Sequence, residues 1–442
     1  MQFSSLQMKR HFIAGKTIVG IDPSKLKFDA AVIDCNGLLQ GKTFTFQNSH
    51  EGFKKQLWIF MDKRIFYLSK QNTVFAIEAA CNLWQKLADY LCQQGYTVVV
   101  INPLCAYKAR SLVNHSFSKT DAKDALVIAN SAKEGYFDFY RIYSDHIKAM
   151  HDLAVTYDKL KRSLSQARLR LRSLVEQTFP EFPTIVKLST NTALFLLEHY
   201  VMPQEFLDAN IFKTIQGMQQ VSRKRKGVKE LRKLQEAARH SIGLNLDTEQ
   251  IQAAHLARDS WIAIIKLLLV QIDNVQSELI SQAKQKPYFD ILTSIKGISD
   301  ISASLFIAEV RDLYNFQHYK QLEAFAGLGL RNSDSGTYKG YRHISRIGNN
   351  RLRSIIYRMT TETKNHIPEI RIRFLKRQMK QDRYRRNVIA CSSNLLRLIM
   401  VLVQENRPYE FREDKVKELE QLEDKIEQLK KKRTKQSYKK AS

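Results

Sequence analysis

Two carboxylates lie three residues apart in the segment Lys119–Ala125, at the start of an apolar helical pattern. In a helix, this spacing places Asp121 and Asp124 on one face. Like charges held so close repel each other, and protonation, a neighbouring cation or solvent relieves the repulsion. Two interpretations follow. Either the pair ligates a divalent metal, or Thr120 or Asp121 caps the helix and the acids complement its dipole.

Two further acids follow apolar segments that are typical of buried strands. The segment Thr17–Ile21 leads into Asp22, and the segment Val74–Ile77 leads into Glu78. Carboxylates at strand ends converge on one edge of a sheet, where ligands commonly bind. Together with the helical pair they favour a bound cation, and hard carboxylate oxygens suit Mg²⁺ or Mn²⁺. Two such ions can activate an attacking oxygen and stabilise a leaving one in phosphodiester chemistry. A solvated loop end is the alternative for each acid.

A glycine-rich segment, Ala326–Gly336, places Ser335 beside a glycine and ahead of several arginines. A serine in a field of arginines loses its proton more easily, and the arginines can stabilise the charge on an attacked phosphate. An ordinary loop serine is the alternative interpretation, and Ser333 is a competing nucleophile. The arginines that follow are Arg342, Arg346, Arg351 and Arg353.

The charge balance predicts a polyanionic partner. Lys and Arg number 71 against 44 Asp and Glu, which gives a formal net charge of +27. Nucleic acid is the first candidate for such a partner. Long amphipathic helical patterns carry many of these cations, and their solvated faces are expected to contact phosphates. The candidate contacts are Arg168, Arg170, Arg172, Arg223, Lys224, Arg225 and Lys226.

A second phosphate-binding candidate is a helical hairpin. The segments Leu292–Ser299 and Ile301–Val310 predict two helices joined by a tight glycine turn. Such a hairpin can present backbone N–H groups at a helix N-terminus to a phosphate without reading sequence. Lys296 and Gly297 are the candidate contacts. A plain helical corner explains the pattern equally well.

The elements that must position the N-terminal acids read as strands and helices in the order βββαβαβαα. This order predicts a mixed sheet flanked by helices. Residues 1–16 read as a polar, basic lead-in, and Asn36–Gly37 is a hairpin signal. The predicted strands are 17–21, 28–33, 42–46, 74–77 and 97–101, and the predicted helices are 51–68, 83–93, 104–112 and 121–133.

Long helices dominate the rest of the chain, and 442 residues are too many for one ordinary core. Beyond Pro408 the tail is a short coiled-coil candidate. Helical patterns cover 150–179, 184–217, 222–239, 255–284, 351–364 and 387–403. The expected domains are 1–140, 141–286 (a helical region), 287–405 (with the hairpin and the serine loop) and 406–442 (a charged helical tail).

Other sites and locations are disfavoured. The five cysteines have no paired spacing, so neither a disulfide framework nor a zinc site is indicated. The longest apolar runs, 261–272 and 395–403, are too short to span a bilayer and are interrupted by Lys266 and Arg397. The N-terminus has no secretory pattern. We therefore expect a cytoplasmic, nucleoid-associated protein with no membrane partner.

These motifs together resemble the DEDD transposases of bridge-RNA-guided insertion sequences. That family has its metal-binding acids in "GIDxxK", in a strand ending in Glu and in "KTDxxDA", and its C-terminal domain carries "AGL", "SG" and "ISRxGNxxLR". The matching segments here are Gly20–Lys25, Phe75–Glu78, Lys119–Ala125, Ala326–Leu328, Ser335–Gly336 and Ile344–Arg353.

The resemblance implies a fold and a function. It implies an α/β RNase H-like (RuvC-like) domain, followed by mostly α-helical middle and C-terminal domains. Ser335 would be the nucleophile that cuts and rejoins DNA at element ends and target, and a structured guide RNA would select that DNA. The domains would complete each other's site across the subunits of a dimer or tetramer. The metal-binding acids would be Asp22, Glu78, Asp121 and Asp124.

The chain departs from the family in its loops. Ala80–Cys81 replaces a usual Thr-Gly, and Lys296 and Leu330 replace prolines. Residues 184–260 read as a possible insertion. Two alternative functions stay open: a RuvC-type metal-dependent endonuclease with no covalent step, and a non-enzymatic basic nucleic-acid-binding protein.

Overall fold

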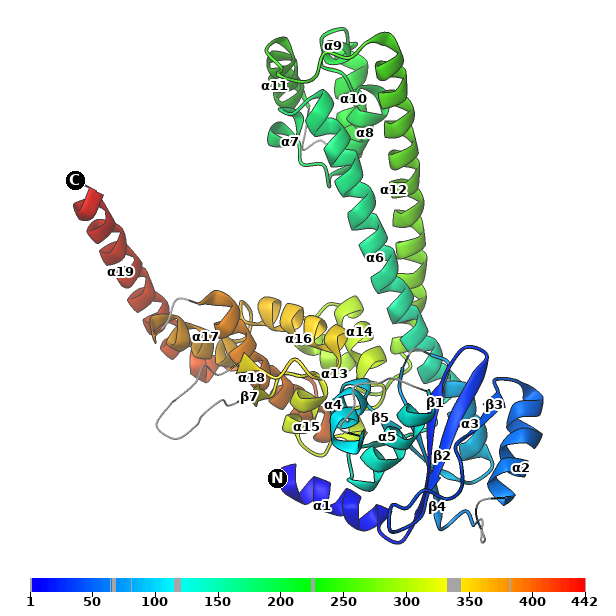
Figure 1. Cartoon of the computed structure of the whole chain (residues 1–442). Helices are drawn as coiled ribbons and strands as arrows, with labels where there is room; N and C mark the ends of the chain where they lie inside the picture. The colour runs from blue at the N-terminus through cyan, green and yellow to red at the C-terminus, as the bar shows by residue number, and fades with distance from the viewer. Residues whose placement is uncertain are drawn as a thin grey trace. The chain divides into compact units, whose positions relative to one another are not determined.

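The computed structural model describes residues 2–63, 65, 69–80, 82–114, 121–223, 227–331, 343–380 and 383–441. The chain divides into two compact units, Met1–Ser144 and Asp145–Ser442 (Figure 1). The first unit is an α/β structure with a hydrophobic core on each side of its sheet, and the second is mostly helical with one extended core.

A mixed sheet, six-stranded over the described residues, forms the centre of the first unit, in the order β3-β2-β1-β4-β5-β6. β1, β2 and β3 form an antiparallel meander, β4 lies parallel to β1, and β5 lies parallel to β4. β6 adds an antiparallel edge. The strands span Thr17–Pro23 (β1), Lys27–Ile33 (β2), Phe44–Gln47 (β3), Thr73–Glu78 (β4), Thr97–Ile101 (β5) and Asp138–Phe139 (β6).

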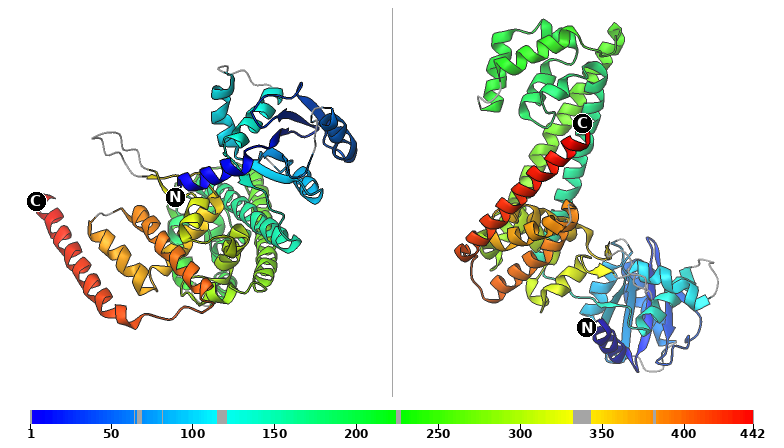
Figure 2. Two further views of the ribbon diagram at one scale, coloured as in Figure 1. Left: turned by 90° about the horizontal axis from the view of Figure 1, so that it is seen from below. Right: turned by 90° about the vertical axis from the view of Figure 1, so that its left-hand side faces the viewer.

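Helices cover both faces of this sheet (Figure 2). Side chains of α2 and α3 pack on one face, and those of α1, α4 and α5 pack on the other. A short π-helix, Gly52–Gln56, leads into α2. The helices span Gln2–Ile13 (α1), Leu57–Asp62 (α2), Gln85–Gln93 (α3), Pro103–Asn114 (α4) and Asp121–Lys133 (α5).

The predicted mixed sheet is confirmed, and two elements of this unit, α1 and β6, were missed. Residues 2–13 form α1 instead of an irregular lead-in. Its Ile13 is buried against the sheet, and Phe12 packs edge-on to Phe139 of β6 with the ring centroids 4.9 Å apart. Neither element has a strong pattern of its own, because each is stabilised by contacts with residues far away in the sequence.

The close approach of α5 to β1 depends on Gly20. A Cβ atom at this position would lie 2.2 Å from the carbonyl oxygen of Ala125 and 2.8 Å from the Cβ of Ala129. A side chain here would therefore push α5 away from the sheet. The even-numbered residues of β1 consequently face α5.

Two long helices, α6 (Asp145–Thr178) and α12 (Thr248–Ala283), pack together as a pair in the second unit (Figure 1). Helical patterns over 150–179 and 255–284 predicted these two helices. Short helices lie between them in sequence: Phe182–Ile185 (α7), Asn191–His199 (α8), Pro203–Leu207 (α9), Ile211–Ser222 (α10) and Val228–Arg239 (α11). The helix predicted to begin at Ser222 begins instead at Val228, because Arg223 is left-handed with φ of 53° and ends α10.

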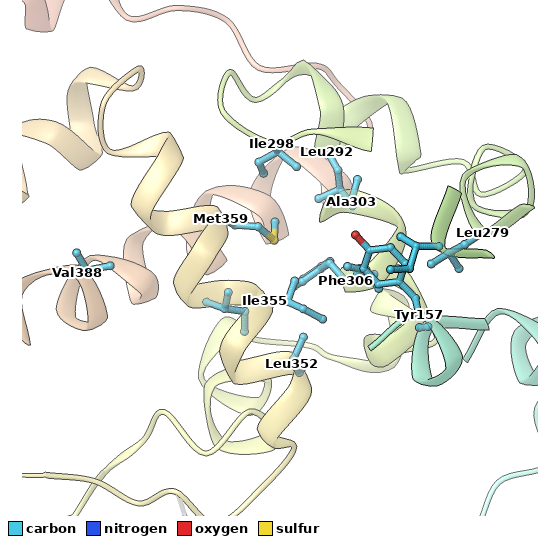
Figure 3. Packing of buried hydrophobic residues seen from close by; sticks show 14 of the residues in the cluster. Tyr157, Leu279, Leu292, Ile298, Ala303, Phe306, Leu352, Ile355, Met359 and Val388 are labelled. Carbon is cyan, nitrogen blue, oxygen red and sulfur yellow. The ribbon is translucent and has the colours of Figure 1, made fainter. Parts of the chain in front are cut away.

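The C-terminal helices share the core of α6 and α12, as the residues of α13, α14 and α16 in Figure 3 show. Gly297, with φ of +102°, makes the tight turn between α13 and α14. The predicted hairpin is therefore present, whereas α17 was missed. The elements are Phe289–Ser294 (α13), Asp300–Val310 (α14), Tyr319–Phe325 (α15), Leu330–Arg331 (β7), His343–Ile344 (β8), Asn350–Thr363 (α16), Pro368–Lys380 (α17), Tyr384–Gln404 (α18) and Val416–Ala441 (α19).

One helix of the described chain, α18, is long and apolar enough to cross a membrane by length and composition. Within its most apolar window, 56% of the helix is buried inside the structure. α18 packs on α16 and α17, which is how a core helix of this composition behaves. The tail helix α19 packs on α17, where Arg371 pairs with Glu423 at 3.0 Å and Lys376 pairs with Glu418 at 2.6 Å.

Candidate active site

Asp22 and Glu78 lie at the same end of the sheet, on adjacent parallel strands. Ile21 of β1 is in register with Ile77 of β4, so the two acids are the next residues of the two strands. Side chains alternate along a strand, and Gly20 faces α5, so Asp22 and Glu78 belong to the row on the α5 side. Glu78 is 8% exposed, which makes it one of the few buried acids of the unit.

The N-terminus of α5 points to this same end of the sheet. Lys133, at the other end of the helix, donates a hydrogen bond to the carbonyl oxygen of Asn36. Asn36 lies in the turn after β2, beside the start of β1, because Ile33 pairs with Ile18. α5 therefore runs opposite to β1, and the helix begins toward the ends of β1 and β4 that carry Asp22 and Glu78.

Asp124, one turn into α5, is held by an arginine of α4. Arg110 Nε lies 2.8 Å from Asp124 Oδ1, and Arg110 Nη2 lies 3.0 Å from Asp124 Oδ2. The Asp124 side chain is 4% exposed and that of Arg110 is 30% exposed. This bidentate, charge-assisted ion pair neutralises a carboxylate that is almost fully buried.

The acids fit a divalent cation by their chemistry, since all are carboxylates on elements that end at one place. The side chain of Asp121 and all of Thr120 lie outside the described residues, so the metal and capping interpretations of this turn stay predictions. Among the side chains that are described, no group of three or more His, Cys, Asp or Glu is arranged to hold a metal. Arg110 supplies the positive charge at Asp124.

The serine loop is described only at its two ends. Ser333, Ser335, Gly336 and Arg342 lie outside the described residues. Before the gap, β7 pairs with β8 from after it, and the Ser345 N–H donates to the Gly329 carbonyl at 2.7 Å. These contacts bring the two ends of the serine loop together.

Gly348 and two arginines tighten this base. Gly348 has φ of +142°, and a Cβ there would lie 2.5 Å from the carbonyl oxygen of Phe325. Arg353 Nη1 donates to the Ala326 carbonyl at 2.9 Å. Arg346 has φ of 57°, and its N–H donates to the Gly327 carbonyl at 3.1 Å. The predicted phosphate contacts Arg346 and Arg353 therefore shape the base of the loop, and a phosphate role for them stays a prediction.

A buried glutamate anchors the same base from α14. Glu309 is 2% exposed and accepts from Arg351 Nε and from Asn349 Nδ2, each at 2.6 Å. Asn349 also caps α16, because its Oδ1 accepts from the Leu352 N–H at 3.0 Å. Arg351, another predicted phosphate contact, thus has a buried protein partner.

His151 of α6 completes this network. Its Nε2 lies 3.0 Å from Arg351 Nη2. Burial lowers the pKa of His151, and Glu309 opposes that shift only in part. A guanidinium only donates, so Nε2 is the acceptor and the imidazole is neutral, with its proton on Nδ1. The long helix α6 is thereby linked to the residues that follow the serine loop.

The other predicted phosphate contacts are spread over the second unit. Arg170 is exposed, and its guanidinium carbon lies 4.9 Å from the centroid of the Trp261 ring. Arg172 Nε pairs with Glu176 Oε1 at 2.7 Å. Arg168 is half-buried. Arg223 is exposed where α10 ends, and Lys224, Arg225 and Lys226 lie outside the described residues.

The hairpin turn faces protein on one side. A Cβ at Gly297 would lie 2.9 Å from the backbone nitrogen of Thr363, so the turn packs against the end of α16. Lys296 beside it is exposed. The observed packing explains the glycine as a structural corner, and a phosphate contact at this turn stays a prediction.

Two transposase profiles match the chain. Residues 19–180 match a profile described as Transposase, and residues 289–374 match the profile Transposase IS116/IS110/IS902 family. The chain belongs to this transposase family. The predicted resemblance is thereby confirmed at the level of the family.

The relatives support this assignment over most of their length. The pilin gene-inverting proteins of Moraxella bovis and Moraxella lacunata are 23% and 25% identical over 402 residues, which cover 90% of this chain and 98% of each relative. The insertion element IS110 uncharacterized 43.6 kDa protein of Streptomyces coelicolor is 21% identical over 307 residues, 67% of this chain and 73% of the relative.

Sequence reasoning missed three residues that hold these sites in the transposase: Arg110, Glu309 and His151. Arg110 and Asp124 are 14 positions apart on different helices, and Glu309 and Arg351 are 42 positions apart. No short-range pattern pairs such residues. One signal was available: Glu309 is an acid inside an otherwise apolar helical run, and such a residue is buried only with a partner. His151 gave no signal at all.

Proposed function

We propose that this transposase is a DNA recombinase with a serine nucleophile, Ser335, and a divalent-metal site formed by acids of the α/β unit. The observation that carries the proposal is the placement of the acids. Asp22 and Glu78 lie at the same end of two adjacent strands, and α5 begins toward that end of the sheet, in a member of a transposase family. The acids that would hold Mg²⁺ or Mn²⁺ are Asp22, Glu78, Asp121 and Asp124.

The sheet order supports an RNase H-like assignment for the first unit. Three antiparallel strands are followed by two parallel ones in the order β3-β2-β1-β4-β5, with helices on both faces. We assign residues 1–140 to this RuvC-like domain and 287–405 to a transposase domain that carries the serine loop. The helical region 141–286 lies between them in the chain, and 406–442 form the charged tail.

The proposed reaction begins at the Ser335 hydroxyl. Its oxygen attacks the phosphorus of a DNA phosphodiester, the hydroxyl proton leaves, and the bond from phosphorus to one sugar oxygen breaks. That sugar oxygen takes up a proton, and the phosphate stays esterified to the serine. A hydroxyl of a second DNA end then attacks the phosphoserine, which restores the serine and joins the strands. A divalent cation at the acids would polarise the attacked phosphate.

The loop base is the part of the second unit that serves this chemistry. Glu309, Asn349 and Arg351 hold the start of α16, and Gly348 and Arg353 hold the loop's end against the segment 325–327. A nucleophile gains reactivity when its backbone is preorganised, because less ordering remains for the transition state.

The partners follow from the charge and from the family. DNA is the substrate of a transposase, and the excess of +27 suits the phosphates of DNA and of a structured guide RNA. We propose that the protein works as a dimer or tetramer, with the two domains completing a site across subunits, in the cytoplasm at the nucleoid. Two relatives carry the name pilin gene-inverting protein, which favours segment inversion as one outcome of the reaction.

The deciding experiment is a search for the covalent intermediate. Full-length protein is incubated with element-end DNA, the cognate RNA and Mg²⁺, then denatured and resolved on a gel that separates protein-bound DNA. We expect a DNA adduct that is lost in Ser335→Ala and strongly reduced in Asp121→Ala, while Ser333→Ala retains it. An adduct that survives Ser335→Ala contradicts the proposed nucleophile.

Two other outcomes identify the alternative functions. Cleaved DNA without an adduct, unaffected by Ser335→Ala, would indicate a RuvC-type metal-dependent nuclease. Binding without cleavage, together with alanine substitutions of all four acids that change nothing, would indicate a non-enzymatic nucleic-acid-binding protein. Either result rejects the serine recombinase.

A further inference from the structure

We propose that Arg110 is an internal counter-ion that competes with the divalent cation for Asp124. In the absence of metal and DNA, Arg110 closes the acidic site. When DNA binds, the guanidinium moves from the carboxylate to a DNA phosphate, and the cation takes its place at Asp124. This inference rests on the metal site of the proposed function, and it adds a coupling between metal and DNA that the proposed chemistry does not require.

The pair with Arg110 leaves Asp124 little capacity for metal. Each of its two oxygens accepts a hydrogen bond from Arg110, at 2.8 and 3.0 Å. A metal ligand must offer an oxygen lone pair to the cation, and a guanidinium at that carboxylate repels a second positive charge. Metal and arginine therefore compete.

Asp124 requires a cation nearby. Its side chain is 4% exposed. A carboxylate removed from water in this way is strongly unfavourable without a positive partner, and Arg110 supplies one. Whichever cation is present, guanidinium or metal, satisfies the same need.

Arg110 is able to move away from Asp124. Its side chain is 30% exposed, so it reaches solvent, in contrast to the carboxylate beneath it. It projects from α4, the helix that packs on α5 at the end of the sheet where the acids lie. A guanidinium binds phosphate with the same two-pronged geometry that it uses for a carboxylate. The DNA backbone is therefore a matched acceptor for the displaced side chain.

The coupling has a thermodynamic consequence. If DNA removes Arg110 from Asp124, DNA raises the affinity for metal, and metal raises the affinity for DNA by the same factor. The free protein would then bind metal weakly, and the acidic site would be completed only on substrate. Arg110 would limit unspecific cleavage of DNA by a protein with net charge +27.

The test measures Mn²⁺ binding to the full-length protein by electron paramagnetic resonance of the free ion, without DNA. We compare wild type with Arg110→Gln, which keeps a hydrogen-bond donor and removes the charge. We expect Arg110→Gln to bind Mn²⁺ about tenfold more tightly, as removal of a close like charge predicts. The matched control is Arg10→Gln, which removes an equal charge from an exposed pair with Glu134 in the same unit and is expected to leave the affinity unchanged.

Loss of folding is separated from loss of binding by thermal melting. Arg110→Gln is expected to melt at a lower temperature than wild type without metal and to gain more stability from Mn²⁺, because the ion replaces the missing cation. A second arm adds a short DNA duplex. We expect DNA to tighten Mn²⁺ binding by wild type several-fold and to have a much smaller effect on Arg110→Gln.

The outcomes distinguish this inference from the proposed function. If Asp22→Asn does not weaken Mn²⁺ binding, the proposed metal site fails. If Asp22→Asn weakens it while Arg110→Gln binds Mn²⁺ no more tightly than wild type, the metal site stands and the competition is overturned. Equal effects of DNA on wild type and Arg110→Gln would overturn the exchange with phosphate.

Discussion

Two buried carboxylates in this protein are paired with arginines, and the pairs differ in what surrounds them. Asp124, in the α/β unit, is held within the described part of the chain by a bidentate pair with Arg110. Glu309, in the helical unit, accepts from two residues, and its Arg351 also contacts His151. A pair with one partner can exchange that partner, whereas a network of four residues loses several contacts at once. The first pair suits a switch and the second suits a scaffold.

Breaking the network around Glu309 in the helical unit should have the largest effect on stability. Glu309→Gln is expected to lower the free energy of unfolding by about 3 kcal/mol, because it leaves the charge of Arg351 without its buried partner. Urea unfolding measures the change. The control, Glu134→Gln, breaks an exposed pair with Arg10 and should cost less than about 1 kcal/mol. A Glu309→Gln protein as stable as wild type would remove the scaffold role.

The loop base is expected to be the next most sensitive. Gly348→Ala should lower the unfolding free energy by about 2 kcal/mol, because its Cβ would lie 2.5 Å from the Phe325 carbonyl oxygen at φ of +142°. Limited proteolysis should also cut the serine loop faster. Gly329→Ala is the matched control, since a Cβ there meets nothing within 4 Å. Equal behaviour of the two variants would argue against a tight base.

Added Mn²⁺ should affect the stability of the two arginine variants differently. Arg110→Gln and Arg351→Gln each remove the partner of a buried acid, and each is expected to lower the melting temperature. Mn²⁺ at millimolar concentration should restore most of the loss in Arg110→Gln, about 1 to 2 kcal/mol, because a cation can bind at Asp124. It should restore none in Arg351→Gln. Rescue of both variants would show that the two pairs do not differ in the way proposed.

The smallest expected effect is a pH dependence of the network. The pKa of His151 is lowered in the folded protein, so the unfolded chain binds the proton more readily. Stability from this group is therefore full above its unfolded pKa of about 6.5 and is lost as pH falls below that value. The free energy of unfolding of wild type, measured with urea, should fall by about 1 kcal/mol or less between pH 7.5 and pH 5.5. His151→Gln should show a shallower slope than wild type.

Much of the α/β unit could be predicted because its signals are local. The predicted strands 17–21, 74–77 and 97–101 are apolar runs rich in β-branched residues, and burial of whole strands such as Thr73–Glu78 needs that composition. The positions of Asp22 and Glu78 at strand ends could be predicted because an acid after such a run is conspicuous. The hairpin turn at Gly297 was also predicted from a local signal, because a tight turn between two helical patterns requires a positive φ, which glycine adopts readily.

The missed features depend on contacts between distant residues. α1 and β6 contact each other through Phe12 and Phe139, and neither has a periodicity that stands alone. The break between α10 and α11 depends on one left-handed arginine, Arg223, which no composition rule marks. α17 carries charged residues among its apolar ones and is stabilised by packing on α18 and α19.

The sequence by itself determined the types of residue available for chemistry, their order and the elements that carry them. Local propensity and periodicity depend on neighbours within a few positions, and these are written in the chain. Tertiary structure decided which charges meet. Arg110 lies against Asp124, and Arg351 lies against Glu309 and His151, because folding brings separate helices together. The energy of a buried charge depends on its surroundings in space, so these pairings could be assigned only from the fold.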